Sequence, residues 1–175
     1  MDDLLTKASN IRLVVFDVDG VMTNGDIIVN SNGEELKIFY VQDGLGLQML
    51  KKLGCQVAVI SARSSEPVVK RMAELGIEHL YQGQKDKRAS MLAILKDLKI
   101  NKSESVYVGD DLIDLPAMNE AGIAVAVANA HPLVKSRADW VTENQGGRGA
   151  VREVCEFIIK AHGKLDQIYN EYTQK

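Results

Sequence analysis

Residues 13–20 read Leu13-Val14-Val15-Phe16-Asp17-Val18-Asp19-Gly20, so that four apolar residues run directly into two aspartates and a glycine. An unbroken apolar run of this length is typical of a strand that is buried on both faces, as in a parallel sheet. Gly20 favours a turn, because glycine adopts backbone conformations that other residues avoid. The segment therefore predicts a buried strand that delivers two carboxylates to a loop and splays them into different positions.

The residues that follow alternate between strand-like and helix-like patterns. Asp26–Val29 and Glu35–Val41 flank an Asn-Ser-Asn-Gly turn and predict a β-hairpin at about residues 26–41. The further expected strands are 57–60, 79–81, 105–108 and 123–127, and the expected helices are 43–53, 66–75, 90–98, 115–121 and about 150–161. Such alternation indicates βαβ units with right-handed crossovers. The predicted fold is α/β, with a Rossmann-like, mostly parallel sheet, helices on both faces and a protruding β-hairpin.

The composition narrows the class of protein. The 175 residues are 46% hydrophobic and 26% charged, which suits a single domain over residues 1–175 with one sizeable core. A net charge of −3 argues against a nucleic-acid-binding surface. Neither the two cysteines nor the three histidines have the spacing of zinc ligands. The acidic first residues are unlike a signal peptide, and the apolar run 121–128 is too short to span a bilayer, so a cytoplasmic protein without membrane contact is expected.

Polar residues gather directly after the predicted strands, where open α/β sheets bind their ligands. They are Asp17, Asp19, Ser61, Ala62, Arg63, Lys85, Lys87, Gly109, Asp110, Asp111 and Asp114. Carboxylates that are brought together repel one another unless they are protonated or bind a cation. Oxygen ligands without histidine or cysteine favour Mg²⁺. We therefore expect a magnesium site that also accepts a phosphate oxygen.

These residue types suit phosphoryl transfer. One carboxylate can attack phosphorus while another moves protons, and a cation, a lysine and a hydroxyl can stabilise the transferring oxygens. Each feature also has a plainer interpretation: Asp17 and Asp19 as a solvated loop, Asp110 or Asp111 as a helix cap, Ser61 as an N-cap and Lys87 as a surface residue. Their joint occurrence in one order favours an enzyme acting on a phosphate ester.

The chain resembles the haloacid dehalogenase superfamily through four motifs in order and spacing. They are residues 16–23 (Phe-Asp-Val-Asp-Gly-Val-Met-Thr), residues 59–61 (Val-Ile-Ser), Lys87, and residues 109–114 (Gly-Asp-Asp-Leu-Ile-Asp). The resemblance implies that Asp17 is the nucleophile and that Asp19 acts as general acid and then as base. It implies that Asp17, the Asp19 backbone carbonyl and Asp110 hold Mg²⁺. The remaining implied roles are phosphoryl binding by Ser61 and Lys87, and orientation of Lys87 and metal-bound water by Asp111 and Asp114.

The intervals between these motifs are too short for a cap domain, so the resemblance is to the capless branch. Within it the chain resembles the phosphatases of 3-deoxy-D-manno-octulosonate 8-phosphate, through residues 17–25, 43–46, 80–83 and 146–153. This implies Mg²⁺-dependent hydrolysis of that substrate to the free sugar acid and phosphate through an aspartyl-phosphate, in lipopolysaccharide precursor synthesis. The implied substrate contacts are Asp19, Tyr40, Val41, Gln42, Asp43, Gly44, Gln48, Arg63, Arg71 and Lys87. Gln42 stands where the family often has arginine, and Ala62 where it usually has glycine.

Three alternatives stay open at this point. A phosphatase of a nine-carbon sialic-acid-type phosphate is the nearest, and Arg63 argues against it. A receiver-like phosphoacceptor domain uses similar residues, but the order of Ser61, Lys87 and Asp110 in this chain differs from that of a receiver. A purely structural subunit of a tetramer is the third, and the intact set of catalytic residues argues against it.

The resemblance also implies a homotetramer. The hairpin carries apolar residues that suit pairing with equivalent hairpins: Ile27, Val29, Ile38 and Tyr40. The segment Gly146–Gly149 is expected to be mobile enough to approach a ligand. The polar tail, about residues 163–175, has few apolar anchors and is expected to reach toward an adjoining active site, the alternative being a disordered tail.

Overall fold

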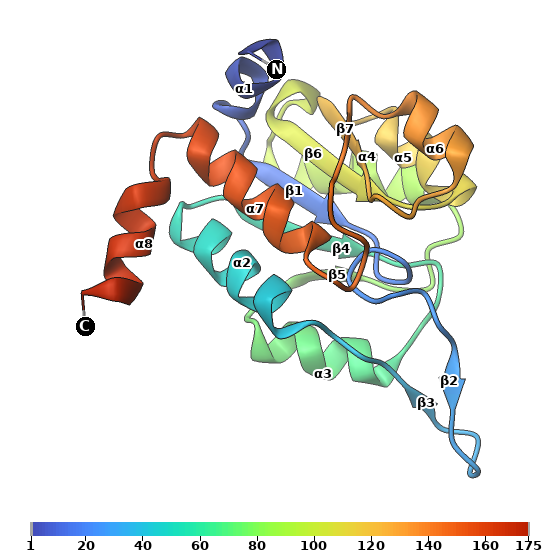
Figure 1. Cartoon of the computed structure of the whole chain (residues 1–175). Helices are drawn as coiled ribbons and strands as arrows, with labels where there is room; N and C mark the ends of the chain where they lie inside the picture. The colour runs from blue at the N-terminus through green and yellow to red at the C-terminus, as the bar shows by residue number, and fades with distance from the viewer. Residues whose placement is uncertain (1, 175) are drawn as a thin grey trace.

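The computed structural model describes residues 2–174, and six parallel strands lie at its centre in the order β5-β4-β1-β6-β7-β8 (Figure 1). They are β1 (Leu13–Phe16), β4 (Gln56–Ile60), β5 (His79–Tyr81), β6 (Ser105–Gly109), β7 (Ile123–Ala126) and β8 (Trp140–Val141). All four residues of β1 are buried, as expected of a central strand. The predicted α/β fold with a parallel sheet and helices on both faces is confirmed.

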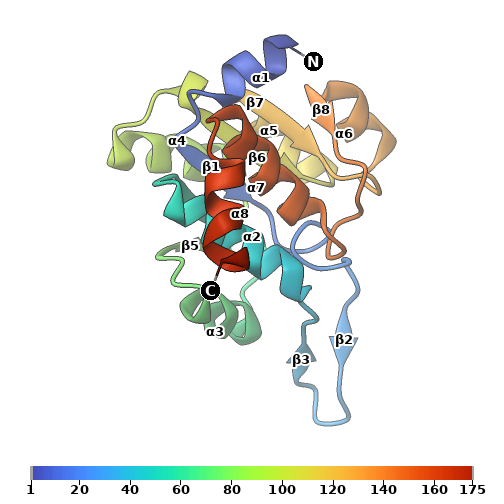
Figure 2. The same cartoon turned by 60° about the vertical axis from the view of Figure 1, so that its left-hand side comes forward.

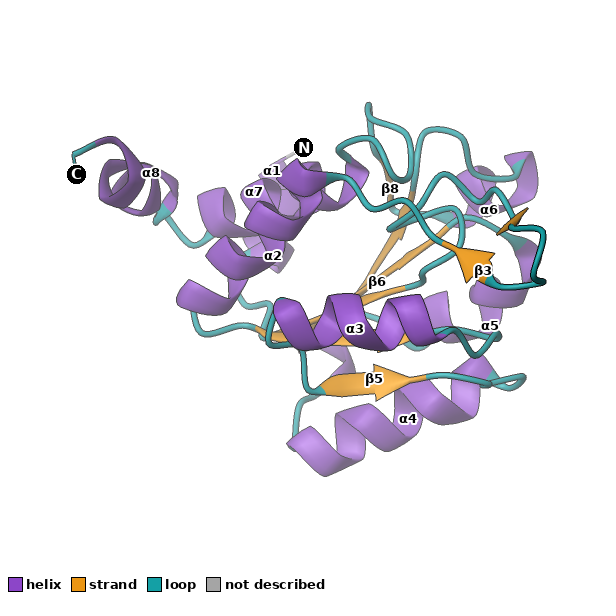
Figure 3. Cartoon of the chain, turned by 90° about the horizontal axis from the view of Figure 1, so that it is seen from below, coloured by secondary structure: helices purple, strands orange, loops and turns teal. Residues whose placement is uncertain are grey.

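Helices cover both faces of this sheet. They are α1 (Asp2–Ala8), α2 (Val41–Lys52), α3 (Glu66–Glu74), α4 (Lys87–Leu98), α5 (Leu115–Met118), α6 (Pro132–Arg137), α7 (Ala150–Ala161) and α8 (Leu165–Thr173). Two short 3₁₀ helices span Lys102–Glu104 and Leu112–Asp114. Helices α2 and α7 pack against each other on one face, and α4 packs with α5 on the opposite face (Figure 3). Within residues 2–174, no helix is long and apolar enough to cross a membrane.

The hairpin consists of two short antiparallel strands, β2 (Ile28–Val29) and β3 (Glu35–Leu36), and projects away from the sheet (Figures 1 and 2). Its presence was predicted, but its strands are shorter than the apolar pattern indicates. Val41, expected at the end of a strand, is the first residue of α2. Beyond Leu36, the Lys37 side chain is 1% exposed and Phe39 packs against the core, and the two strands pair over only two residues each.

Two further expectations require correction. Lys87, expected in a loop, is the first residue of α4, whose N-terminus is capped by the Asp86 side chain accepting from the Ala89 amide at 3.0 Å. The tail, expected to have few anchors, forms α8 on its own chain, where Ile168 is only 4% exposed. The possibility of a disordered tail is therefore wrong up to residue 174, and residue 175 lies outside the described residues.

Polar contacts also hold α8 against the rest of the chain. Lys52 bonds to Glu171 at 2.8 Å and lies 4.5 Å above the Tyr172 ring. The Tyr169 hydroxyl donates to Glu156 at 2.6 Å. The sequence analysis treated this segment as a polar tail, although four of its residues recur at helical spacing: Leu165, Ile168, Tyr169 and Tyr172.

Candidate active site

The register of the sheet brings the three leading candidate residues to one place. Phe16 of β1 is level with Val59 of β4 and with Val108 of β6. Asp17, Ser61 and Asp110 therefore leave three adjacent strands at almost the same height. A cavity of about 240 Å³ opens there, and its lining is Asp17, Asp19, Gly25, Ser61, Ala62, Arg63, Lys87, Asp110, Asp111 and Ile113. The carboxyl-end site predicted from the strand pattern is thus formed within one chain.

Two glycines let the surrounding loops approach this site closely. Gly20 has a φ of 94°, and a Cβ placed there would lie 2.0 Å from Asp110 Oδ2. A Cβ on Gly146 would lie 1.7 Å from the Gly20 carbonyl oxygen, and the Gly147 amide donates to the Val21 carbonyl at 2.9 Å. Within the segment Gly146–Gly149, Gly146 and Gly147 pack against the loop that carries Asp19, and Arg148 and Gly149 border a neighbouring hollow; its approach to a ligand stays a prediction. Any larger side chain at Gly20 would displace the Asp110 carboxylate.

Lys87 lies at the centre of a buried polar network. Its Nζ is 2.7 Å from Asp17 Oδ1 and 2.7 Å from Asp114 Oδ1. Burial alone would lower the pKa of Lys87, but the two carboxylates outweigh it and raise that pKa above its usual range. The lysine therefore remains a cation next to Asp17, with its direction fixed by Asp114.

Asp114 has its hydrogen-bonding capacity filled by the protein. Besides Lys87, its Oδ1 accepts from the Tyr107 hydroxyl at 2.9 Å, and its Oδ2 accepts from the amides of Asp110 and Asp111 at 3.0 and 3.2 Å. Asp111 is exposed, and its side chain accepts from the Leu112 amide at 2.8 Å. This geometry matches the orienting role expected of Asp114. Asp111 lines the cavity, but the carboxylates that contact Lys87 are those of Asp17 and Asp114.

Asp110 is the opposite case, because its Oδ1 is buried without a hydrogen-bond partner. Burial and the neighbouring Asp114, Asp17 and Asp111 carboxylates raise the pKa of Asp110 to about 8. Burial, and then Asp114, also raise the pKa of Asp17 above its ordinary range. Among the described residues, Asp17, Asp110 and Asp114 offer oxygen atoms within 4.8 Å of one another. An unpaired carboxylate oxygen beside a second carboxylate is the arrangement that a divalent cation relieves, so these residues fit Mg²⁺.

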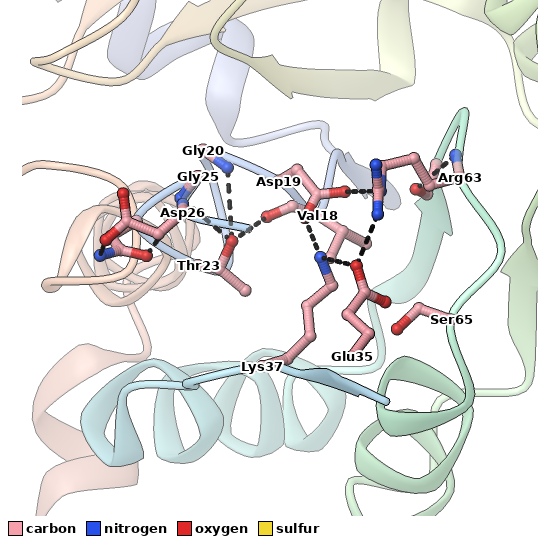
Figure 4. Close-up of polar contacts among 12 residues, drawn as sticks. Val18, Asp19, Gly20, Thr23, Gly25, Asp26, Glu35, Lys37, Arg63 and Ser65 are labelled. Atoms are coloured by element: carbon pink, nitrogen blue, oxygen red, sulfur yellow. Dashed lines mark hydrogen bonds and ion pairs between the residues drawn. The ribbon is translucent and has the colours of Figure 1, made fainter. Parts of the chain in front are cut away.

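Asp19 stands at the rim of the cavity among charged side chains (Figure 4). Lys37 bonds to its Oδ1, and Arg63 Nε lies 3.9 Å from its Oδ2. Glu35 Oε1 is 2.7 Å from Arg63 Nη2 and 3.2 Å from Lys37 Nζ. The neighbouring Ser65 hydroxyl, followed by Arg63 and Lys37, lowers the pKa of Glu35 to about 2. Glu35 is therefore a permanent anion at this rim.

The remaining expected substrate residues do not line this cavity. Tyr40 and Gln42 border a separate hollow of about 210 Å³, where the Arg148 guanidinium lies 5.9 Å from the Tyr40 ring centre. Asp43 is buried, and its carboxylate accepts from the Arg152 amide at 2.9 Å. Val41 and Gln48 are exposed on α2. Gly44 lies against Arg71 of α3, since a Cβ on Gly44 would be 2.4 Å from Arg71 Nη2.

Three residues that sequence reasoning did not single out belong to the site. They are Glu35, Lys37 and Tyr107. Tyr107 reads as one more apolar position in a buried strand, although it is fully buried and its hydroxyl reaches Asp114. Glu35 and Lys37 alternate with Leu36 and Ile38 and so resemble the solvent face of a hairpin. No local pattern indicates that this face folds back onto the loop after β1.

Chemically, the cavity combines a buried carboxylate next to a lysine, a cation-binding carboxylate, a hydroxyl and a half-buried carboxylate. The Ser61 hydroxyl accepts from the Arg63 amide at 3.2 Å, which leaves its proton free to point elsewhere. This set can bind a phosphoryl group, supply a nucleophile and move a proton.

Comparison with known proteins finds relatives along nearly the whole chain. The family model described as haloacid dehalogenase-like hydrolase matches residues 74–154. The Escherichia coli (strain K12) protein called 3-deoxy-D-manno-octulosonate 8-phosphate phosphatase KdsC is 51% identical over 165 residues, which cover 94% of this chain and 88% of that protein. A crystal structure of 3-deoxy-D-manno-octulosonate 8-phosphate phosphatase from Moraxella catarrhalis, in complex with magnesium ion, phosphate ion and KDO, has a TM-score of 0.96 at 46% identity. That similarity covers 98% of this chain and 99% of that chain. The cobalt-bound phosphatase from Haemophilus influenzae has a TM-score of 0.89 at 39% identity, over 93% of this chain and 98% of that chain.

Proposed function

Because the chain belongs to the 3-deoxy-D-manno-octulosonate 8-phosphate phosphatases, within the haloacid dehalogenase-like hydrolases, we propose that it hydrolyses this sugar-acid phosphate to the free acid and phosphate. The protein is a phosphoric monoester hydrolase that uses Mg²⁺. The observation that carries the proposal is the unpartnered, buried Asp110 Oδ1 beside Asp17 and Lys87. A purely structural role would leave this costly arrangement without a use, and the order of Ser61, Lys87 and Asp110 along the chain argues against a receiver-like domain.

In the proposed mechanism, an oxygen of Asp17 attacks phosphorus and forms an aspartyl-phosphate. Lys87 supports this step because its ammonium, held by Asp114, lies 2.7 Å from Asp17 Oδ1 and faces the phosphoryl oxygens. The Ser61 hydroxyl donates a further hydrogen bond to those oxygens. Asp19 gives a proton to the departing sugar oxygen and then takes one from the water that hydrolyses the intermediate.

Asp17, Asp110 and the backbone carbonyl of Asp19 would hold Mg²⁺. When bound, the ion neutralises carboxylate and phosphate charge and polarises the phosphoryl group. Asp114 is poorly suited as a direct ligand, because its four hydrogen bonds already occupy both of its oxygens. Its part is to fix Lys87.

In this proposal, Arg63 at the rim of the cavity binds the carboxylate of the sugar acid. Arg63 is 46% exposed there, and Glu35 engages its Nη2 only, so other donors of the guanidinium remain for a substrate carboxylate. A planar fork of N–H groups matches a carboxylate better than a hydroxyl. An acidic substrate is therefore favoured over a neutral sugar phosphate. A nine-carbon acid phosphate has the same carboxylate and remains the competing substrate.

The substrate assay that tests this function measures phosphate release with Mg²⁺ from the eight-carbon acid phosphate, a nine-carbon acid phosphate and a neutral hexose phosphate. The eight-carbon substrate should have the highest kcat/KM, and Asp17→Asn should abolish turnover of all three. Arg63→Ala should reduce turnover of both acids more than turnover of the neutral ester. A higher kcat/KM for the nine-carbon acid would replace the proposed substrate, and near-normal turnover by Asp17→Asn would remove Asp17 as the nucleophile.

We further propose that the enzyme acts as a homotetramer in the cytoplasm, in lipopolysaccharide precursor synthesis. The support for assembly is twofold. Ile27, Val29 and Ile38 of the hairpin are 62%, 56% and 57% exposed. The expected substrate residues on α2 and α3 do not line the cavity of their own chain, so they would need a second copy to take part. Whether the tail after α7 also covers a neighbouring site stays a prediction.

A further inference from the structure

One lysine of the projecting hairpin has a buried side chain, although the apolar residues on either side of it are exposed. Leu36 and Ile38 are 49% and 57% exposed, whereas the Lys37 side chain is 1% exposed. Its Nζ bonds to Asp19 Oδ1 and lies 3.2 Å from Glu35 Oε1. Burying an ammonium group is costly unless it is paired, so the hairpin carries its own carboxylate to this point.

Lys37 is one of four side chains that form a closed ring of alternating charge, Asp19-Lys37-Glu35-Arg63 (Figure 4). Glu35 uses the same oxygen, Oε1, for both Lys37 and Arg63. We call this group the hairpin charge ring. Because every member contacts two others, the displacement of one side chain disturbs two contacts, and each member limits where the others can go.

The hairpin charge ring treats the two oxygens of Asp19 differently. Oδ1 is engaged by Lys37, whereas Oδ2 lies 3.9 Å from Arg63 Nε, beyond hydrogen-bond distance. Oδ2 is therefore the oxygen that remains available to carry a transferable proton. Lys37 thus holds one oxygen of Asp19 and leaves the other without a hydrogen bond inside the ring, while Glu35 holds both Lys37 and Arg63.

We propose that Lys37 and Glu35 are positioning residues, which orient Asp19 for proton transfer to the leaving group and Arg63 for the substrate acid. The proposal rests on the function proposed above. In the step concerned, the bond from Asp17 to phosphorus forms while the bond from phosphorus to the sugar oxygen breaks. The electron pair of the broken bond passes to that oxygen, which takes the proton from Asp19. The hairpin is in this way a working part of the active site.

If Lys37 and Glu35 orient Asp19, the loss of activity in their variants should depend on the leaving group of the ester. A purely structural role would produce the same loss for every ester. A sugar alkoxide is a strong base and needs the proton as it departs, whereas 4-nitrophenolate is a weak base and departs without it. A misplaced Asp19 should slow phosphoryl transfer from the sugar much more than from 4-nitrophenol. The ratio kcat/KM isolates this effect, since it reports only steps up to formation of the aspartyl-phosphate.

The decisive experiment compares kcat/KM of Lys37→Met and the wild type on the sugar-acid phosphate, phenyl phosphate and 4-nitrophenyl phosphate, with saturating Mg²⁺. Misplacement of a catalytic group by about 1 Å costs roughly 10²-fold. We therefore expect a loss of about 10²-fold on the sugar substrate, an intermediate loss on phenyl phosphate and a loss of at most a few-fold on 4-nitrophenyl phosphate. Lys37→Arg keeps the cation and should recover part of the sugar activity.

Two further variants keep the test informative if Lys37→Met folds poorly. Glu35→Gln leaves Lys37 in place and should show a smaller loss with the same selectivity. Glu34→Gln is the matched control, since Glu34 neighbours Glu35 and its Oε2 accepts from Asn30; it should match the wild type on every substrate. Equal losses on all three esters for Lys37→Met and Glu35→Gln, or no losses, would overturn the positioning role. A wild type that does not turn over the sugar acid phosphate would instead overturn the proposed function.

Discussion

The carboxylate of Asp110 suits metal binding but lowers the stability of the metal-free protein. Its Oδ1 is buried without a partner, and three other carboxylates lie near enough to raise its pKa to about 8. In the metal-free protein, the folded state holds the proton of Asp110 more tightly than the unfolded chain does, so Asp110 stabilises the fold only in its protonated form. This contribution of Asp110 to the free energy of unfolding is complete at pH values below the ordinary carboxyl range and is lost as the pH rises through about 8. Metal binding therefore requires the Asp110 carboxylate, although that carboxylate destabilises the metal-free protein.

Asp110→Asn should consequently raise the melting temperature of the metal-free protein, because the amide carries no charge to desolvate. The gain, measured by thermal unfolding in EDTA, should be larger at pH 8.5 than at pH 6, since the native aspartate is charged only at the higher pH. The same variant should need about tenfold or more Mg²⁺ for half-maximal activity, a loss of roughly 1.4 kcal/mol in binding. Excess Mg²⁺ should restore part of the activity.

Exposed Asp111→Asn, at the adjacent position, serves as the control. It should change the melting temperature in EDTA little at either pH. An Asp110→Asn protein with unchanged Mg²⁺ dependence would show that Asp110 is not a ligand. If Asp110→Asn has an unchanged or lower melting temperature in EDTA at pH 8.5, the charged Asp110 does not destabilise the metal-free protein.

At the scale of elements, Asp43 joins α2 to α7. Its carboxylate accepts from the amides of Arg152 and Gly149, at 2.9 and 3.4 Å, and so caps the N-terminus of α7 from a different helix. The family resemblance implied that Asp43 contacts substrate. The contacts within the chain point to a structural task, since a carboxylate at a helix N-terminus satisfies free amides and complements the helix dipole.

Asp43→Ala should destabilise the protein by about 1–2 kcal/mol, as other lost helix caps do. For a chain of this length the change corresponds to a fall of roughly 2–8 °C in melting temperature, measured by calorimetry. Asp43→Asn keeps an oxygen acceptor and should lose less. An unchanged melting temperature together with a raised KM for the sugar acid would instead assign Asp43 to the substrate.

The elements that could be predicted from sequence are those whose signals are local. Apolar runs and glycine stops predict three of these elements. They are the strand from Leu13 to Phe16, the loop carrying Asp17 and the last core helix from Ala150 to Ala161. For the same reason, the sequence predicts that the polar residues after the strands meet at one edge of the sheet, as Asp17, Ser61 and Asp110 do. The hairpin charge ring and the cap on α7 could not be predicted, because each joins residues that only the tertiary fold brings together.

At the scale of the whole molecule, the active site is open on one chain. The cavity has polar walls and a half-exposed Arg63, and phosphoryl transfer benefits when water is excluded. The hairpin meanwhile exposes apolar side chains on both of its strands. Exposed apolar residues on an unpaired strand edge are typical of contacts between copies. An assembly through the hairpins would bury these residues and bring the α2 and α3 residues of one copy near the site of another.

Replacing Ile27 and Val29 together by glutamate should therefore break the assembly, since four hairpins brought together would each carry two added charges. Light scattering should find a tetramer for the wild type and a smaller species for the variant. If another copy completes the substrate site, kcat/KM for the sugar acid phosphate should fall by about tenfold or more, equivalent to roughly 1.4 kcal/mol, while turnover of 4-nitrophenyl phosphate should change little. Leu92→Glu, an exposed apolar position on α4, is the matched control and should remain a tetramer with normal kinetics. A monomeric wild type would rule out assembly through the hairpin. A dissociated variant with full activity on the sugar acid would show that one chain binds its substrate unaided.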